Sequence, residues 1–288
     1  MMLALVSAMM MASAGASGAG SGVDGFGPGG SGHCRILLTN DDGIDAPGLA
    51  AAYESLSTLC ETIVAAPATN QSGASHSVLN KDGRVRVRKA LVAGVPAHAV
   101  EGSPAESVAV GLLGIGAGKS FDLVVSGINH GENLGLGNLY SGTVNAAMEG
   151  ALRGVPAIAV SQAMRSKDYA RSAQLTRTIA GRLLGGKLPA SIVLNINVPD
   201  GELRGICMAA SGRLTVATSF EPTVHDAETT IYKLRIEPAE RNAAAGDIAA
   251  YNSGCTTITP LALDRTANEA LASLAASIDA GSISLPNR

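Results

Sequence analysis

The chain has 288 residues, of which 46% are hydrophobic, and a formal net charge of -3. This length and composition predict one large globular α/β domain or two small ones, and the near-neutral charge argues against a nucleic-acid polymer as a partner. An aromatic content of 3%, with no tryptophan, argues further against base-stacking platforms and aromatic-rich interfaces.

Residues 1–33 precede the expected fold. A short apolar run at 2–11 is followed by Ala12-Ser13-Ala14 and a tract of Gly, Ser and Ala. The small residues resemble a signal-peptide cleavage site, but no Lys or Arg precedes the apolar run, which is too short to span a membrane. We expect a disordered, dispensable extension on a cytoplasmic protein; export directed by residues 1–14 is the alternative.

A buried strand expected at residues 35–39 ends abruptly in Asn40, Asp41, Asp42 and Gly43. In open α/β sheets, ligands bind just outside the carboxyl ends of the strands. Two adjacent carboxylates repel each other, and burying them is costly unless a counter-charge is present. A hard divalent cation bound through oxygen supplies that charge. The alternative interpretation of Asn40 to Gly43 is an ordinary polar turn without a bound ion.

The next elements form a β-α-β unit. A helix is expected at 47–60 and a second buried strand at 62–66, which leads into the polar loop 70–77. A right-handed crossover brings the carboxyl ends of two parallel strands together, so this loop should face the carboxylates. Ser72 in the loop is a candidate neutral oxygen ligand, although a generic Ser-rich loop also fits the pattern.

The following stretch combines a hairpin with a return to the parallel core. Residues 84–88 alternate as a half-exposed strand does, and 97–101 are expected to pair with them. The alternating arginines are typical of a solvated strand face. Ser103 and Glu106 form a capping box at the start of a helix, and 121–126 form a third buried strand.

A Gly-spaced polar loop follows the third strand, and Asn129 in it is placed to offer a carbonyl oxygen. Ser141, Gly142 and Thr143 then precede a helix. A helix start offers free N–H groups and a partial positive charge, and glycine lets a ligand approach the backbone. This arrangement predicts a phosphate cradle; simple N-capping by Ser141 or Thr143 is the alternative.

The second half of the chain is less informative. Strands are expected at 156–161 and 192–198, helices at 169–184 and 267–278, and strand-like runs at 213–218 and 229–236. The last two runs suggest an antiparallel extension over or beyond the core. Together the elements predict an α/β fold with a Rossmann-like parallel sheet, helices on both faces, a β-hairpin arm and this C-terminal extension.

The four cysteines are Cys34, Cys60, Cys207 and Cys255, and none has C-x-x-C spacing, so neither a zinc site nor a redox motif is indicated. Cys60 and Cys207 lie in apolar contexts and are expected to be small core residues. The even number permits two disulfides, which a chain of this size does not require.

Three strand ends are thus expected to meet, carrying the two carboxylates, Ser72, and Asn129 with the cradle behind it. Oxygen-only ligands favour Mg²⁺ or Mn²⁺ over zinc. A divalent cation facing a phosphate cradle is suited to phosphate ester hydrolysis. The sequence contains neither a P-loop motif nor a Gly-x-Ser-x-Gly elbow, which argues against P-loop NTPases and serine hydrolases.

Several stretches occur together in a characteristic order. They are Ile-Leu-Leu-Thr-Asn-Asp-Asp-Gly-Ile at 36–44, Gln-Ser-Gly at 71–73, Ser-Gly-Ile-Asn-x-Gly-x-Asn at 126–133, Tyr-Ser-Gly-Thr-Val at 140–144, Ala-Ala-Met-Glu-Gly at 146–150, Pro-Ala-Ile-Ala-Val-Ser at 156–161, Asn-x-Asn-x-Pro at 195–199 and Thr-Pro-Leu at 259–261. Over roughly residues 35–265 the chain resembles the SurE family (survival protein E, stationary-phase 5′-nucleotidases). Ordered motifs at compatible spacing are far more specific than a lone short motif.

We expect neither a nucleic-acid polymer nor a membrane as a partner, and the resemblance implies hydrolysis of nucleoside 5′-monophosphates. It implies one divalent cation per subunit, Mg²⁺ or Mn²⁺, held by Asp41, Asp42, Ser72 and Asn129. It also implies a single domain over 34–288, whose region from about residue 200 exchanges between subunits of a homodimer or homotetramer. The N-terminal extension departs from the family pattern, whose chains usually begin just before the first strand.

Roles for the remaining candidates follow as hypotheses. The residues assigned to substrate or phosphate binding are Asn40, Ser141, Gly142 and Thr143. His76 and His130 are candidate proton donors to the leaving alkoxide, because histidine titrates near neutral pH; a supporting or surface role is the alternative for each.

Two other functions fit the same residues. One is a broader phosphomonoesterase or exopolyphosphatase, and the other is a non-catalytic nucleotide-binding module on the same scaffold. A pure phosphate binder would avoid two carboxylates beside its anionic ligand unless a metal lay between them, which favours the enzymatic interpretations.

Overall fold

The computed structural model describes residues 34–186, 188–213, 218–225, 228–236 and 245–278. The predicted extension at 1–33 lies outside these residues, as does most of the expected strand-like run at 213–218. Within the described part of the chain, no helix is long and apolar enough to cross a membrane.

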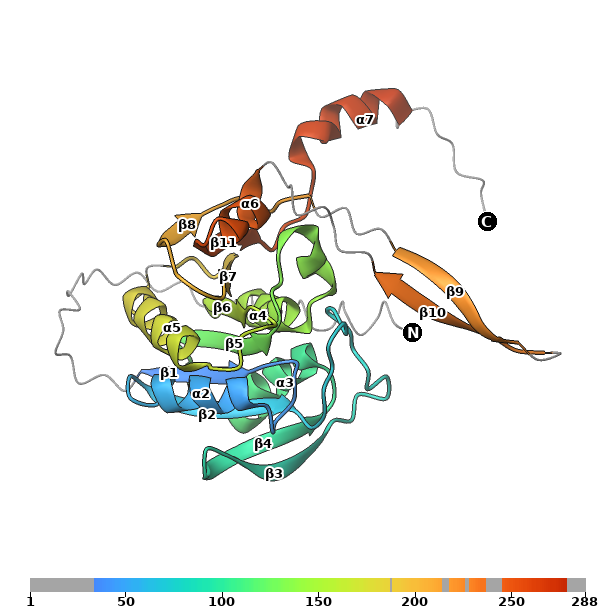
Figure 1. The fold of residues 1–288 in the computed structure, drawn as a ribbon. Helices are drawn as coiled ribbons and strands as arrows, with labels where there is room; N and C mark the ends of the chain where they lie inside the picture. The colour runs from blue at the N-terminus through green and yellow to red at the C-terminus, as the bar shows by residue number, and fades with distance from the viewer. Residues whose placement is uncertain (1–33, 187, 214–217, 226–227, 237–244, 279–288) are drawn as a thin grey trace. The chain divides into compact units, whose positions relative to one another are not determined.

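A mixed, mostly parallel sheet forms the core (Figure 1). Its strands are β1 (Arg35–Thr39), β2 (Glu61–Pro67), β3 (Arg86–Val92), β4 (Val95–Glu101), β5 (Leu123–His130), β6 (Ala157–Gln162), β7 (Ile192–Val198), β8 (Ile206–Met208) and β11 (Thr256–Ala262). Among the described residues, the sheet order is β3-β4-β2-β1-β5-β6-β7-β11-β8. Strand β1 is central and pairs in parallel with β2 on one side and β5 on the other, so the carboxyl ends of all three strands meet at one edge.

Helices cover both faces of this sheet, as predicted (Figure 1). Helices α2 (Pro47–Leu56) and α5 (Ala170–Leu183) pack together on one face, and α3 (Pro104–Val110) and α4 (Gly142–Leu152) pack together on the other. Strand β1 contributes side chains to the hydrophobic cores on both faces of the sheet. Ile36 and Leu38 pack on the face covered by α2, and Leu37 packs on the face covered by α4. All three side chains are fully buried, which explains why the strand is a continuous apolar run without alternation.

The connections on the two sides of β1 create a crevice at the sheet edge. Helix α2 links β1 to β2 on one face, whereas α4 links β5 to β6 on the opposite face. The crevice outside the strand ends at such a switch point is where open α/β sheets bind ligands. The start of α4 and the turn after β1 both lie at this point.

The predicted helix starts and hairpins are largely confirmed. Ser103 and Glu106 form the capping box of α3, and Ser141 caps α4 through its side chain. Strands β3 and β4 form the expected hairpin, and β10 (Thr230–Ile236) corresponds to the expected run at 229–236. Its antiparallel partner β9 (Thr218–His225) was not predicted, because the expected run at 213–218 shares only Thr218 with it. Helix α7 (Leu271–Ile278) corresponds to the expected final helix.

Three further elements near the C-terminal end were not predicted. They are β8, the short helix α6 (Gly246–Asn252) and β11. Strand β11 runs antiparallel to β7 and parallel to β8, which makes the sheet mixed at this end. Each element is short, and Pro260 interrupts the strand pattern in β11, so local sequence carried little information about them.

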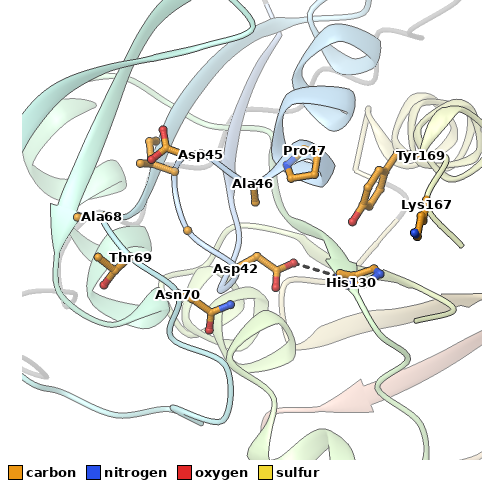
Figure 2. A pocket seen from close by; sticks show the side chains of 12 residues that line it. Asp42, Asp45, Ala46, Pro47, Ala68, Thr69, Asn70, His130, Lys167 and Tyr169 are labelled. Carbon is orange, nitrogen blue, oxygen red and sulfur yellow. Dashed lines mark hydrogen bonds between the residues drawn. The ribbon is translucent and has the colours of Figure 1, made fainter. Parts of the chain in front are cut away.

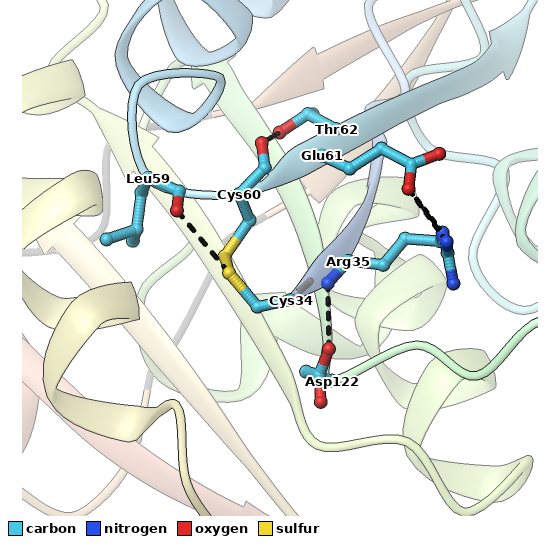
Figure 3. Close-up of a disulfide and its surroundings, with 7 residues drawn as sticks. All are labelled: Cys34, Arg35, Leu59, Cys60, Glu61, Thr62 and Asp122. Carbon is cyan, nitrogen blue, oxygen red and sulfur yellow. Dashed lines mark hydrogen bonds and ion pairs between the residues drawn. A yellow bond between two sulfur atoms is a disulfide. The ribbon is translucent and has the colours of Figure 1, made fainter. Parts of the chain in front are cut away.

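Cys60 is a buried core residue, as expected, whereas Cys207 is only partly buried, and both form disulfides that the sequence did not require. Figure 3 shows the bridge between Cys34 and Cys60. Cys34 and Cys60 immediately precede the parallel strands β1 and β2, in which Arg35 is paired with Glu61, and their Cα atoms lie 5.1 Å apart. Cys207 in β8 bonds Cys255, just before β11, with a Cα separation of 5.8 Å. Strand pairing therefore brings each pair of cysteines together.

Candidate active site

The turn after β1 is closed by Asn40. Its buried amide donates to the carbonyl of Gly43 (2.9 Å) and accepts from the Gly43 N–H (3.2 Å). Gly43 has φ +106, and a Cβ on it would lie 3.1 Å from the Thr69 carbonyl carbon. The turn therefore packs tightly against the loop after β2. Asn40 was predicted to contact phosphate; in the structure its side chain shapes the turn that carries the carboxylates.

Asp41 points toward the start of α4 and is 3% exposed. Its Oδ1 accepts a hydrogen bond from the Thr143 hydroxyl at 2.6 Å. Gly142 permits this approach, because a Cβ there would lie 2.7 Å from Asp41 Cβ. Burial raises the pKa of Asp41, the Thr143 hydrogen bonds oppose the rise, and the neighbouring charge of Asp42 adds to it.

Asp42 lies on the other side of the turn and is half-buried. Its Oδ2 accepts from the backbone N–H of His130 at 3.0 Å, which ties the first strand end to the third. The adjacent Asn129 is 9% exposed, and its amide nitrogen donates to the Gly131 carbonyl at 2.7 Å. That bond orients the amide oxygen of Asn129 away from Gly131, where it is available as a ligand.

The loop that carries Ser72 is held against the same turn. The Gln71 N–H donates to the Asp41 carbonyl at 2.7 Å, and the Ser72 N–H donates to the Asn70 side chain at 2.9 Å. The Ser72 residue itself is exposed. The structure therefore brings the Ser72 loop to the carboxylates, as the crossover argument predicted.

The hydroxyls of the predicted cradle both have partners at the start of α4. The Ser141 hydroxyl accepts from the Val144 N–H at 3.1 Å, which is N-cap geometry, and Thr143 donates to Asp41. Ser141 is therefore the N-cap of α4, which was the alternative to a phosphate-binding role. Capping leaves the hydroxyl proton of Ser141 free to donate to an anion placed at the helix start.

The two candidate histidines have different surroundings. His130 is exposed and lines a cavity beside Asp42. His76 contacts Glu149 of α4 instead, with Nε2 2.8 Å from Oε2. Glu149 is buried and also binds Arg153. The structure thus brings His130, and not His76, to the cavity at the carboxylates.

The donor set at this edge fits a hard cation. In the described portion of the chain, no three His, Cys, Asp or Glu side chains group together to hold a metal ion. A cation here would be held by the carboxylates of Asp41 and Asp42 with neutral oxygens of Asn129 and Ser72, a set typical of Mg²⁺ or Mn²⁺. Such an ion would offset both causes that raise the pKa of Asp41.

A cavity of about 670 Å³ opens beside Asp42 (Figure 2). Its lining residues are Asp42, Gly43, Ile44, Asp45, Ala46, Pro47, Ala68, Thr69, Asn70, His130, Lys167 and Tyr169. Lys167 and Tyr169 come from the loop between β6 and α5, and sequence reasoning did not identify them. Their position just beyond the carboxyl end of a core strand, together with the scarcity of aromatic residues, was the available indication.

Known proteins match this chain over most of its length. A family model described as Survival protein SurE matches residues 36–218. The 5′-nucleotidase SurE of Syntrophus aciditrophicus (strain SB) is 38% identical over 259 residues, which cover 88% of this chain and 97% of that protein. The 5′-nucleotidase SurE of Legionella pneumophila subsp. pneumophila (strain Philadelphia 1) is 41% identical over 238 residues, covering 81% and 92%.

A solved structure agrees with the fold. The crystal structure of the SurE protein from Aquifex aeolicus matches with a TM-score of 0.74 at 32% sequence identity, and the match covers 85% of this chain and 100% of that chain. The resemblance inferred from the motifs is confirmed, and the chain belongs to the SurE family of survival proteins.

Proposed function

We propose that this protein is a 5′-nucleotidase, which hydrolyses nucleoside 5′-monophosphates to a nucleoside and phosphate with one divalent cation, Mg²⁺ or Mn²⁺, per subunit. The family relationship supports this activity, since the matching curated relatives are 5′-nucleotidases. One structural observation carries it: Asp41 and Asp42 lie side by side at the switch point of the sheet, with Asp41 bonded to the start of α4.

Different residues at the strand ends are proposed to bind the cation and the phosphate. Asp41, Asp42, Asn129 and Ser72 would hold the cation, which when bound supplies positive charge against the anionic phosphate. The start of α4 provides N–H groups, the helix dipole and the Ser141 hydroxyl for the phosphate oxygens. The hydrogen bond from Thr143 fixes the Asp41 carboxylate beside that phosphate position.

Proton donation to the leaving alkoxide is assigned to His130. Its ring lines the cavity beside Asp42, whereas the ring of His76 is engaged with Glu149. General acid catalysis requires a donor within hydrogen-bond reach of the leaving oxygen, which favours the histidine at the cavity. His76 is therefore assigned to holding its loop on α4.

Phosphate release tests the proposed activity. Nucleoside 5′-monophosphates, 3′-monophosphates and short polyphosphate are compared with Mn²⁺, with Mg²⁺ and with EDTA. Metal-dependent release that is fastest from the 5′-monophosphates is expected. Equal release from all substrates would favour the broader phosphomonoesterase, and no release from folded protein would favour a binding module.

The disulfides bear on where the protein works. All four cysteines of the chain are paired, and disulfides form and persist in oxidising compartments. They favour export, with the apolar run at 2–11 as part of the leader, over the cytoplasmic location. Mass spectrometry after alkylation without reductant, on protein from an extracytoplasmic fraction, should find both linked peptides; four alkylated thiols would contradict export.

Assembly into a homodimer or homotetramer through the region after about residue 200 is part of the same proposal. The β9–β10 hairpin exposes apolar side chains, among them Phe220 (65% exposed), Ile231 (52%) and Tyr232 (59%). Such a surface on a two-stranded arm suits burial against another subunit. Light scattering should give a multiple of the chain mass, and Phe220→Glu with Tyr232→Glu should reduce it; a monomeric wild-type protein would contradict the assignment.

A further inference from the structure

The cavity beside Asp42 has walls from three separate loops. Residues 43–47 come from the turn leading into α2, residues 68–70 from the loop after β2, and Lys167 and Tyr169 from the loop before α5. Apolar side chains of Ile44, Ala46, Pro47 and Ala68 line much of it. A mostly apolar recess with a few polar groups is typical of a site for an organic ligand, not for phosphate alone.

The cavity and the phosphate position lie on opposite sides of the carboxylate pair. Asp41 is bonded to Thr143 on α4, which packs on one face of the sheet. Asp42 lines the cavity at the start of α2, which packs on the other face. A phosphate ester bound at the start of α4 and at the carboxylates would therefore extend its alcohol portion across the sheet edge into the cavity.

Tyr169 gives this recess an aromatic wall in a chain that has only five Tyr, three Phe and no Trp. Its ring lies against the first turn of α2, where a Cβ on Gly48 would be 2.8 Å from Tyr169 Cε1. Figure 2 shows the tyrosine on the opposite side of the cavity from Thr69 and Asn70, with Asp42 between them. The ring is thus packed against the start of α2.

Polar groups occur at the rim of the cavity. Lys167 is exposed and carries three donor hydrogens, and Asn70 is exposed opposite it. A flat ring system with oxygen and nitrogen acceptors matches an aromatic wall combined with such donors. A nucleoside has this chemistry, whereas a simple alkyl alcohol or a polyphosphate chain does not.

We propose that this cavity is the nucleoside subsite, in which Tyr169 packs against the base and Lys167 donates to an acceptor on the nucleoside. The inference rests on the proposed nucleotidase activity and adds the residues that distinguish a nucleotide from other phosphate esters. Tyr169 and Lys167 are thereby specificity-determining residues, separate from the groups that hold the cation and the phosphate.

Kinetics on two substrates test the assignment. Guanosine or adenosine 5′-monophosphate is compared with ribose 5-phosphate, which keeps the sugar phosphate and lacks the base. Tyr169→Leu should raise KM for the nucleotides about tenfold, as expected for loss of one base–aromatic contact, with kcat changed by less than about twofold. KM for ribose 5-phosphate should not change, and Tyr169→Phe should retain most of the nucleotide affinity.

Matched controls guard against indirect effects. Lys167→Ala, on an exposed side chain, should raise KM for the nucleotides about threefold, whereas Lys119→Ala, whose ammonium lies near Glu61, should not. The Lys167 variant keeps the proposal testable if Tyr169→Leu unfolds. Equal losses on the nucleotides and ribose 5-phosphate, or no loss in either variant, would overturn the subsite.

Binding of the nucleoside alone separates this inference from the proposed activity. Binding of guanosine or adenosine is measured by saturation-transfer NMR in the presence of EDTA, with the wild-type protein and with the Tyr169→Leu variant. The saturation-transfer signal of the nucleoside should be weaker with the variant. Tyr169-dependent binding without any phosphate release would support the subsite while refuting the nucleotidase. Phosphate release without detectable nucleoside binding, or with nucleoside binding that does not depend on Tyr169, would support the nucleotidase while refuting the subsite.

Discussion

The hydroxyl of Thr143 donates to Oδ1 of Asp41 over 2.6 Å, which joins the start of α4 to the first carboxylate of the pair. Both residues are buried, so the bond is made in a poorly solvated setting. A residue in the first turn of α4, the helix proposed to bind phosphate, therefore orients a proposed cation ligand. Two functions that looked separate in the sequence share one contact.

Thr143→Val should weaken Mn²⁺ binding and lower kcat at least tenfold, because the Asp41 carboxylate loses its side-chain donor. The free energy of unfolding should fall by about 1–3 kcal/mol, as for other buried hydrogen bonds to charged groups. Calorimetric titration of Mn²⁺ and urea unfolding measure the two effects. Thr143→Ser keeps the hydroxyl and should restore both, and unchanged Mn²⁺ affinity in the valine variant would refute the role.

Asp42→Asn should remove metal-dependent turnover, by about a hundredfold or more, because one anionic ligand of a two-carboxylate site is lost. The fold should persist, since Asp42 is half-buried and an amide can still accept from the His130 N–H. Phosphate release and circular dichroism provide the two measurements. Asp82→Asn, in an exposed turn, is the control, and full activity of Asp42→Asn would exclude the metal assignment.

His76→Asn should loosen the loop at 70–77 and leave the chemistry intact. The loop is pinned by the His76–Glu149 contact and by the Ser75 hydroxyl, which donates to the Leu139 carbonyl at 2.8 Å. Faster amide exchange confined to this loop is expected, with a rise in KM for the metal and a small change in kcat. His130→Asn should instead lower kcat, and the opposite ranking would reverse the two histidine assignments.

Asp247→Asn should destabilise the protein by about 1–3 kcal/mol. Asp247 is fully buried, and its two oxygens accept from the N–H groups of Gly135 (2.9 Å) and Gly212 (2.8 Å). An amide offers only one oxygen and would place its NH₂ group against the second N–H donor. Urea unfolding measures the loss, and Asp264→Asn, at an exposed carboxylate that accepts from Thr266, should show a much smaller one.

Replacing Cys34 and Cys60 by alanine should lower the free energy of unfolding by about 2–4 kcal/mol, because the bridge closes a loop between residues 26 apart in sequence. Reduction of the wild-type protein by dithiothreitol opens the Cys207–Cys255 bridge as well, so it should produce a loss at least as large. Activity at low temperature should be retained, since the bridge lies at the amino ends of β1 and β2, away from the site. Equal stability of the oxidised and reduced protein would contradict this expectation.

The core strands and the carboxylate pair could be predicted because their information is local. Strand β1 is an uninterrupted apolar run, and Asp41 and Asp42 follow it directly. The placement of the Ser72 loop and of Asn129 near the carboxylates required only the rule that parallel strands end at one edge. The family resemblance then supplied the substrate class and the ligand set, which spacing alone did not provide.

The missed features depend on long-range pairing. The bridge from Cys207 to Cys255 exists because β8 lies beside β11, a register that no local pattern encodes. Tyr169 reaches the cavity because α5 packs beside α2, so its ring meets Gly48. Asp247 gave no sequence indication of its two backbone partners.

The alternation of Asp41 and Asp42 has a consequence for how this site tolerates sequence change. Asp41 faces α4 and Asp42 faces the cavity, and both lie in the turn directly after β1. Inserting or deleting one residue in β1 would displace this turn and would reverse the alternation of Ile36, Leu37 and Leu38 between the two core layers. Length variation should therefore be excluded from β1 even where individual side chains can be replaced.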